Sequence, residues 1–251
     1  MEAYTDFAGV YDTFMDHTPY KEWCQYLVDV LESYHIKNDL VLDMGCGTGT
    51  LTRMLEQAGY NMIGIDSSDE MLSIAIQKKD EDSSILYLQQ DMREFELYGT
   101  VKAVVSVCDS INYLLEDEDV VQTFKLVNNY LDPDGIFIFD FNTVYKYETV
   151  IGDATIAENR DNCSFIWENY YHEEEQINEY DLTIFVQEND LYKRFNETHY
   201  QRGYTLDEMK DFVEKAGLLF VNAVDADTHQ EITEESERIY IIAQEKGKKN
   251  E

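Results

Sequence analysis

The sequence predicts an α/β fold in which a doubly wound, parallel sheet carries an inserted antiparallel β subdomain. Three observations indicate this. Apolar patterns typical of strands and of helices alternate through roughly the first 140 residues, the order of a parallel sheet with right-handed crossovers. A glycine-rich turn follows the first of these strands. From residue 143 to 203 helical periodicity almost disappears, and tyrosine-rich stretches with period-two alternation replace it.

Five short apolar runs predict the strands of the parallel sheet. The fourth, at residues 101–107, has no polar alternation, as expected for a strand covered on both faces. The stretch Asp132-Pro133-Asp134-Gly135 predicts a turn ahead of the fifth run. In chain order, the runs cover residues 40–44, 61–65, 85–88, 101–107 and 136–141.

Helical patterns lie before and between these strands. Thr18 and Pro19 predict a helix start, as N-cap and first-turn residue, ahead of an apolar face at helical spacing. Residues 51–58 predict the next helix. Ser67 or Ser68 is expected to cap the helix after the second strand. The helix before the fifth strand aligns four apolar residues, Val120, Phe124, Val127 and Leu131.

Residues 144–203 are expected to form the inserted antiparallel subdomain. After it, residues 205–216 restore a helical pattern, and residues 238–244 predict a late strand. The strand patterns inside the insertion lie at residues 164–171, 180–186 and 192–200.

Composition disfavours several classes of function. The formal net charge of -33 repels phosphate backbones and anionic membrane surfaces, so neither nucleic acid nor membrane is an expected partner. No apolar run approaches the roughly 20 residues that span a bilayer. The four cysteines and five histidines show no metal-ligand spacing, so no metal is expected, and the histidines are placed on the surface or in turns. The scattered cysteines and an N-terminus unlike a signal peptide predict a cytoplasmic protein with reduced thiols.

The turn after the first strand carries the first functional signal. Its glycines, Gly45, Gly47 and Gly49, do not have the G-x-G-x-x-G spacing of dinucleotide sites, and no lysine follows them as in a phosphate-binding loop. Asp43 lies inside the strand, two positions before Gly45. A carboxylate at this position would repel a pyrophosphate but would attract an ammonium group. The turn therefore predicts close approach of a cationic, methionine-like ligand to the backbone.

Two further motifs predict contacts to an adenosine. Asp66 lies 21 residues beyond Gly45, at the end of the second strand, where a carboxylate can accept hydrogen bonds from both ribose hydroxyls. Asp91 and Met92 lie just past the third strand. The Asp91 side chain can accept from an adenine amino group while the Met92 thioether packs on the ring.

In this order and spacing, Asp43, the glycines, Asp66 and the Asp91-Met92 pair resemble the class I S-adenosylmethionine-dependent methyltransferases. The segment 4–12 is also similar to the N-terminal segment of many members that act on small molecules. The resemblance implies a Rossmann-like sheet of seven strands that ends in an antiparallel hairpin. It also implies S-adenosylmethionine as the cofactor.

The whole chain looks most like members with a β-rich insertion after the fifth strand, such as the aminosugar N-methyltransferases. The resemblance assigns residues 1–143 and 204–251 to the cofactor-binding domain. Residues 144–203 leave the carboxyl edge of the sheet and are then expected to cap the acceptor. By matching positions, twelve residues are implied to bind the cofactor: Tyr11, Asp43, Gly45, Cys46, Gly47, Gly49, Asp66, Ser67, Met71, Asp91, Met92 and Cys108.

We therefore expect methyl transfer to nitrogen or oxygen of a small-molecule acceptor, by a monomer or a homodimer. Asp109, Asn112 and Tyr113 follow the fourth strand, at the edge where an acceptor would lie. None of them is assigned as a catalytic base, because alignment of the reactants alone could suffice. Two alternatives stay open. One is a cofactor-binding protein without catalysis, and the other is an NAD-dependent oxidoreductase, which the glycine spacing and Asp43 disfavour.

Overall fold

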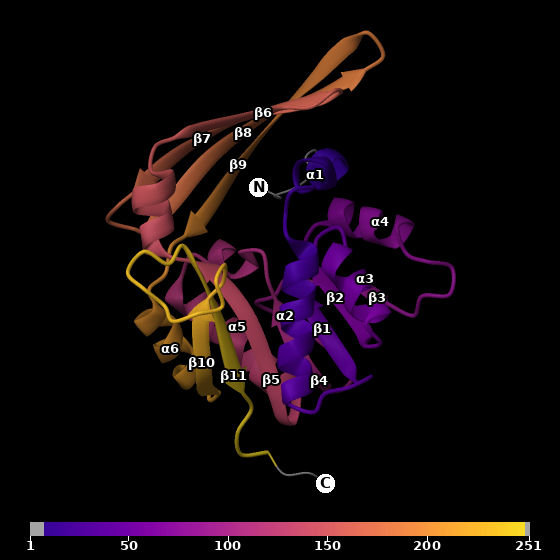
Figure 1. Cartoon of the computed structure of the whole chain (residues 1–251), viewed down its shortest axis with the longest axis vertical. Coiled ribbons are helices and arrows are strands. Elements are labelled where there is room, and N and C mark those ends of the chain that lie inside the picture. Colours follow the sequence, from indigo (N-terminus) through magenta and orange to yellow (C-terminus); the bar gives the residue numbers. More distant parts are fainter. Residues whose placement is uncertain (1–7, 249–251) are drawn as a thin grey trace.

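The computed structural model describes residues 8–248 and contains two sheets (Figure 1). The strands of the larger sheet are β1 (Leu40–Met44), β2 (Asn61–Asp66), β3 (Leu86–Gln89), β4 (Val101–Ser106), β5 (Leu131–Asn142), β10 (Leu219–Asp225) and β11 (Arg238–Gln244). The smaller sheet contains β6 (Thr155–Asn159), β7 (Cys163–His172), β8 (Ile177–Glu188) and β9 (Leu191–Arg202). The helices are α1 (Ala8–Phe14), α2 (Tyr20–Ser33), α3 (Thr50–Gln57), α4 (Asp69–Gln77), α5 (Asp117–Tyr130) and α6 (Leu206–Lys215), with the 3-10 helix η1 (Ser110–Tyr113) and the π-helical turn η2 (Lys146–Ile151).

The larger sheet is doubly wound, with the strand order β10-β11-β5-β4-β1-β2-β3. The five strands from β1 to β5 pair in parallel, and β11 pairs antiparallel with both β5 and β10. The order reverses at β1, so the crevice at the carboxyl ends of β1 and β4 is where such a fold binds its ligand. The predicted fold, a Rossmann-like seven-stranded sheet with an antiparallel final hairpin and an additional antiparallel sheet, is confirmed.

Buried side chains on both faces of β5 hold the helices against the larger sheet. Phe137 and Phe139 face the core shared with α5 and α6, whereas Ile136 and Ile138 face the core shared with α2 and α3. Successive side chains of a strand point to opposite faces, so a strand buried on both needs an unbroken apolar run. This packing fixes the sheet whose carboxyl edge carries the site.

One expected helix cap is corrected by the structure and another is confirmed. Helix α2 begins at Tyr20 with Pro19 at the N-cap position, and Thr18 does not cap it. Of the two candidate caps of α4, Ser67 and Ser68, it is Ser68 whose hydroxyl accepts from the backbone N–H of Met71.

The expected turn at residues 132–135 is instead an irregular stretch inside β5, where the register against β4 shifts. Asp134 there has a positive φ of 61°. A Cβ on Gly135 would lie 2.9 Å from the carbonyl oxygens of both Asp132 and Lys102. The close approach of these backbones is what requires a glycine at this point.

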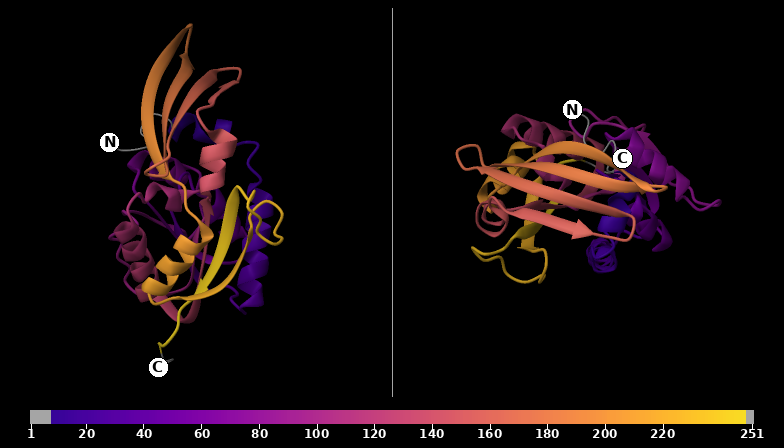
Figure 2. Two further views of the ribbon diagram at one scale, coloured as in Figure 1. Left: turned by 90° about the vertical axis from the view of Figure 1, so that its left-hand side faces the viewer. Right: turned by 90° about the horizontal axis from the view of Figure 1, so that it is seen from above.

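The smaller sheet stands above the carboxyl edge of the larger one and beside α1 (Figure 1). Seen from above, its four strands lie across the top of the main body (Figure 2). The chain leaves β5 and returns to α6 at one place, where Thr143 and Tyr204 form a parallel bridge and the N–H of Val144 donates to the carbonyl of Tyr204.

Helix α1 lies between the smaller sheet and α4. The Phe14 ring meets Phe165 edge-on, with the ring centroids 4.8 Å apart, and Arg160 donates to Asp16 over 2.7 Å. Tyr4 and Phe7, from the N-terminal segment, lie outside the described residues. None of the helices within residues 8–248 has both the length and the apolar character that crossing a bilayer requires.

Candidate functional site

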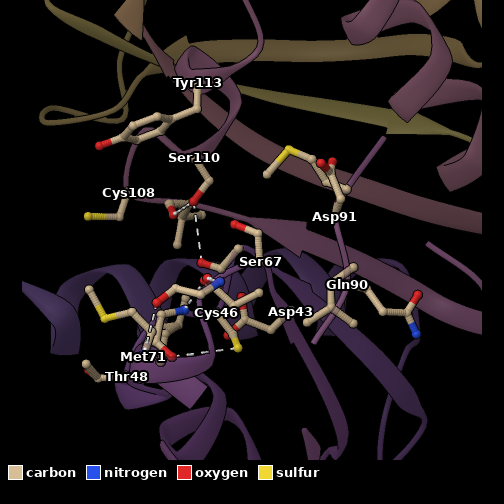
Figure 3. Close-up of a pocket in the computed structure, with 18 of the residues that line it drawn as sticks. Asp43, Cys46, Thr48, Ser67, Met71, Gln90, Asp91, Cys108, Ser110 and Tyr113 are labelled. Atoms are coloured by element: carbon tan, nitrogen blue, oxygen red, sulfur yellow. Dashed lines mark hydrogen bonds between the residues drawn. The ribbon is translucent and has the colours of Figure 1, made fainter. Parts of the chain in front are cut away.

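A cavity of about 460 Å³ lies at the carboxyl edge of β1, β2 and β4 (Figure 3). Tyr11 of α1 and Tyr20 of α2 form the part of its wall that comes from the two N-terminal helices. Its wall includes eleven of the twelve residues proposed as cofactor contacts: Tyr11, Asp43, Gly45, Cys46, Gly47, Asp66, Ser67, Met71, Asp91, Met92 and Cys108.

The glycine turn gives this cavity an open floor. Gly47 has a φ of +53°, and a Cβ built there would meet nothing within 4 Å. A ligand can therefore lie directly against the backbone at Gly47, in the space that a side chain would fill.

Gly49 is the expected contact that does not line the cavity. It lies at the start of α3 with a φ of +72°, and a Cβ there would lie 2.4 Å from the Tyr87 hydroxyl. Gly49 thus shapes the turn from behind instead of forming its wall.

Asp43 is buried beneath the turn and is 2% exposed. Its carboxylate accepts a hydrogen bond of 2.6 Å from the Thr52 hydroxyl. Burial raises the pKa of Asp43 to about 7, although the Thr52 hydrogen bond acts in the opposite direction. A carboxyl group in this state is stabilised as an anion by a cation placed beside it, so it suits the ammonium group of a methionine moiety.

Asp66 connects the turn to the second strand. One carboxylate oxygen accepts from the Gly47 N–H over 2.8 Å, and the other accepts from the Ser68 N–H over 2.9 Å. Burial raises the pKa of Asp66, and these backbone hydrogen bonds partly offset the rise. Each oxygen of a carboxylate can accept more than one hydrogen bond, so Asp66 can shape the turn and also accept from ribose hydroxyls.

Asp91 lies at the rim of the cavity in an ion pair that the sequence did not indicate. The Arg93 guanidinium donates to both carboxylate oxygens, over 2.6 Å and 3.0 Å, and holds the pKa of Asp91 below its usual value. Arg93 also contacts Asp119 at 3.2 Å. The Asp91 carboxylate is therefore fixed as an anion beside Met92, facing the place expected for adenine.

The loop after β4 presents Cys108 in a strained backbone conformation. Cys108 and Asp109 have φ values of 67° and 56°, and two successive non-glycine residues in the left-handed region need outside support. Asp140 supplies it, because its carboxylate accepts from the N–H groups of Cys108 at 3.1 Å and Asp109 at 3.0 Å. Asp140 is itself fully buried, with Arg238 3.6 Å away as its counter-ion.

The Cys108 thiol lies 3.9 Å from the Tyr11 hydroxyl, so this contact joins α1 to the loop after β4 across the cavity. Burial raises the pKa of the Cys108 thiol. A protonated thiol is a poor nucleophile, which protects this residue from alkylation beside a reactive sulfonium.

Sequence analysis missed several wall residues, among them Tyr20, Thr48 and Ser110. Thr48 could have been found from its place within the glycine turn. Its hydroxyl donates to Asp12 of α1 over 2.7 Å, and Lys78, the residue that follows α4, also binds Asp12. No local pattern marks Tyr20 or Ser110, which reach the wall from α2 and η1.

Tyr113 also lines the cavity, at the end away from the glycine turn (Figure 3). Its hydroxyl lies 2.8 Å from that of Tyr180 and 3.2 Å from Nδ1 of His199. Tyr180 and His199 belong to β8 and β9, so these contacts connect the cavity wall with the smaller sheet. His199 is 2% exposed, which corrects the expected surface or turn position.

Comparison with known proteins identifies the family. Residues 41–135 match the methyltransferase domain family. The chain is 39% identical to YqeM of Bacillus subtilis (strain 168), whose name assigns it to the methyltransferases, over 96% of each chain. The chain belongs to the class I S-adenosylmethionine-dependent methyltransferases. The family resemblance seen in the sequence is confirmed, and an NAD-dependent oxidoreductase is set aside.

Solved structures agree with this assignment. The crystal structure of a S-adenosylmethionine-dependent methyltransferase from Clostridium acetobutylicum ATCC 824 superposes on this methyltransferase with a TM-score of 0.88 and 28% identity, covering 98% of this chain and 100% of that one. CalS10, a SAM-bound amino pentose methyltransferase from Micromonospora echinaspora, shares the fold with a TM-score of 0.75 at 15% identity, over 94% and 96% of the two chains. S-adenosylmethionine is the cofactor of this methyltransferase.

Proposed function

We propose that this methyltransferase transfers the methyl group of S-adenosylmethionine to an amine or a hydroxyl group of a small molecule. The observation that carries the proposal is the hydrogen-bonded contact of Tyr113 with Tyr180 and His199. Through it, the smaller sheet contacts the end of the cavity wall that lies away from the glycine turn. An acceptor bound between this wall and the smaller sheet would be a compact molecule and not a polymer.

The proposal divides the chain between two tasks. Residues 1–143 and 204–251 bind the cofactor, with contacts from Asp43, Asp66 and the other wall residues named above. Residues 144–203 cap the acceptor and shape its choice. The fold of CalS10, an amino pentose methyltransferase, supports an acceptor with a comparable amine.

The charge of the cavity supports the same class of acceptor. Within the described part of its wall, Arg93 is the one cationic side chain, and Asp91 and Asp119 already engage it. The carboxylates of Asp43 and Asp66 lie in the same wall. A polyphosphate backbone would meet repulsion there, whereas an amine-bearing molecule would not.

The cofactor supplies an activated methyl group with its leaving group already in place. The residues of this chain then have three tasks, which are to hold both reactants, to align them and to exclude water. Asp43, Asp66 and the glycine turn hold the cofactor. Tyr11, Cys108 and Tyr113 surround the remaining part of the cavity.

Transfer of label from S-adenosylmethionine with a radioactive methyl group tests the proposal. The acceptors are matched pairs, glucosamine with glucose and tyramine with tyrosol, alongside transfer RNA and a mixed protein substrate. We expect label in one or more of the small molecules and none in the polymers. Label in a polymer, or binding of the cofactor in calorimetry without transfer to any acceptor, contradicts the proposal.

A further inference from the structure

A buried polar chain leads from the cavity into the smaller sheet. Tyr113 of η1 lines the cavity, and its hydroxyl lies 3.2 Å from Nδ1 of His199. Nε2 of the same imidazole lies 3.2 Å from a carboxylate oxygen of Glu197. The Tyr180 ring stacks on His199, with the ring centroids 4.8 Å apart and an 8° angle between the planes. Tyr113 and His199, which are 86 positions apart in sequence, thus belong to one chain of polar contacts.

Hydrogen-bond chemistry gives this chain a direction. An ionised carboxylate only accepts, so Nε2 of His199 carries the proton that binds Glu197. In a neutral imidazole Nδ1 is then an acceptor, and the Tyr113 hydroxyl donates to it. A proton that reaches the Tyr113 oxygen from the cavity can therefore displace the phenolic proton toward His199.

Burial separates this His–Glu pair from an ordinary surface ion pair. The side chains of His199 and Glu197 are 1% and 8% exposed. The same sheet contains a surface pair, His172 and Glu179, at 2.9 Å with 47% and 29% exposure. Removing a carboxylate and an imidazole from water costs free energy. The buried His199–Glu197 pair beside a cavity tyrosine is therefore better explained by a function than by stability.

We propose that Tyr113, His199 and Glu197 form a proton relay that takes the proton from the acceptor as it is methylated; this inference rests on the proposed function. The acceptor's lone pair forms the new bond to the methyl carbon, and the carbon–sulfur bonding pair stays with the sulfur. The acceptor's proton passes to the Tyr113 oxygen, while the phenolic proton passes to Nδ1 of His199. The product is an imidazolium ion beside the Glu197 carboxylate, and it loses its proton to water once the product has left.

The three residues have different roles in this relay. Tyr113 is the catalytic residue, because it faces the acceptor. His199 stores the proton, and Glu197 is a positioning residue that selects the tautomer and stabilises the imidazolium. The ionisable groups that contact His199 come from several elements: Glu197 on β9, Tyr180 on β8 and Tyr113 on η1.

Nitrogen NMR of the histidine side chains in the full chain tests the relay without any acceptor. We expect His199 in the tautomer protonated at Nε2, and a shifted Nδ1 resonance in Tyr113→Phe. Glu197→Gln replaces the carboxylate that accepts from Nε2 and should shift the Nε2 resonance of His199. His172→Asn, the surface control, should leave the His199 signals unchanged. A proton on Nδ1, or Nδ1 signals indifferent to Tyr113→Phe, overturns the relay.

Kinetics with the glucosamine–glucose and tyramine–tyrosol pairs supply the second readout. Tyr113→Phe and His199→Asn should each lower kcat by about 100-fold while KM stays within about threefold. The double variant should be no slower than either single one, because both break the same relay. Glu197→Gln should lower kcat by about tenfold, and His172→Asn should not change it.

Two further readouts separate a relay from a structural role. His199→Gln can keep a hydrogen bond to Tyr113 but cannot take up the proton, so its kcat should be as low as that of His199→Asn. Cofactor affinity, measured by calorimetry, should be unchanged in every variant. Full activity in His199→Gln overturns the relay. A wild-type protein that transfers no methyl group to either pair contradicts the proposed function, whereas a wrong His199 tautomer contradicts the relay alone.

Discussion

The two ends of the cavity are built by different kinds of contact. At the glycine turn, side-chain carboxylates bind backbone N–H groups, as Asp66 does with Gly47 and Ser68. At the other end, side chains bind side chains, as Tyr113 does with Tyr180 and His199. Hydrogen bonds to backbone N–H groups depend little on neighbouring side chains, whereas one substitution can change the partners in a network of side chains. The glycine-turn end, proposed to hold the cofactor, is therefore suited to stay constant while the end at Tyr113, proposed to hold the acceptor, varies.

The largest effect is expected where the two ends meet, at Asp140. Asp140→Ala should lower the free energy of unfolding by about 3 kcal/mol, because it leaves Arg238 buried without its counter-ion and frees the loop at Cys108 and Asp109. Urea denaturation measures this. Asp227→Ala removes the exposed partner of Arg238 and should change stability by no more than about 0.5 kcal/mol. Equal effects of the two variants would show that the buried carboxylate does not support the loop.

Asp66→Ala should produce the next largest effect, now on the cofactor alone. We expect binding of S-adenosylmethionine to weaken by about 1–3 kcal/mol, since ribose hydroxyls in the closed site lose their acceptor. Calorimetric titration gives the affinity. Asp69→Ala, a nearby exposed carboxylate in the first turn of α4, serves as the matched control. Unchanged affinity would mean that Asp66 only stabilises the turn and the start of α4.

Asp43 gives a smaller effect that depends on pH. Its pKa of about 7 leaves it mostly protonated at pH 6 and mostly ionised at pH 8. Because a cationic ligand prefers the ionised form, wild-type affinity for S-adenosylmethionine should rise by about tenfold over that interval. The affinity of Asp43→Asn for S-adenosylmethionine should be nearly the same at pH 6 and at pH 8. The same slope in Asp43→Asn would assign the titration to another group.

The raised pKa of Asp43 also has a consequence for stability. The unfolded carboxyl group titrates near pH 4, so the native state binds more protons between about pH 4 and pH 7. The unliganded protein should therefore lose stability as the pH rises through this window. Asp43→Asn should remove that loss, and urea midpoints measured across the window give the comparison.

The smallest effect is expected at Asp12, which connects α1 to Thr48 of the turn and to Lys78, the residue that follows α4. The pair with Lys78 is partly exposed, so Asp12→Ala should speed the release of S-adenosylmethionine by only about two- to fivefold. Stopped-flow fluorescence measures the release rate. Asp16, just after α1, contacts Arg160 and the exposed His17 but neither Thr48 nor Lys78, so Asp16→Ala should leave the rate unchanged. If Asp16→Ala has the larger effect, α1 is held mainly by the smaller sheet.

Local sequence patterns predicted which residues line the glycine-turn end of the cavity, because these residues lie at strand ends and in one short turn. Asp43, Gly47 and Asp66 follow directly from the order of strands in a doubly wound sheet. Gly49 was placed in the wall because its motif does not reveal which glycine faces the ligand. The exposed edge strands β6 and β10 have no alternating burial, and the patterns in the residues did not locate them.

The acceptor end could not be predicted in the same way. Tyr113 and His199 are 86 positions apart, and no spacing rule joins a residue after the fourth strand to one in the inserted sheet. A single histidine within a tyrosine-rich strand carries no sign of its partner. His199 became significant only once β8 and β9 had been placed beside η1.

The bridge between Thr143 and Tyr204 has a consequence for how the chain tolerates change. Thr143 and Tyr204 lie side by side, so the roughly sixty residues between them form one loop that is closed at its base on the main sheet. The entropy needed to close a loop grows only slowly with its length. We therefore expect that shortening, lengthening or exchanging the strands between these ends leaves the pairing of β5 with β11 intact.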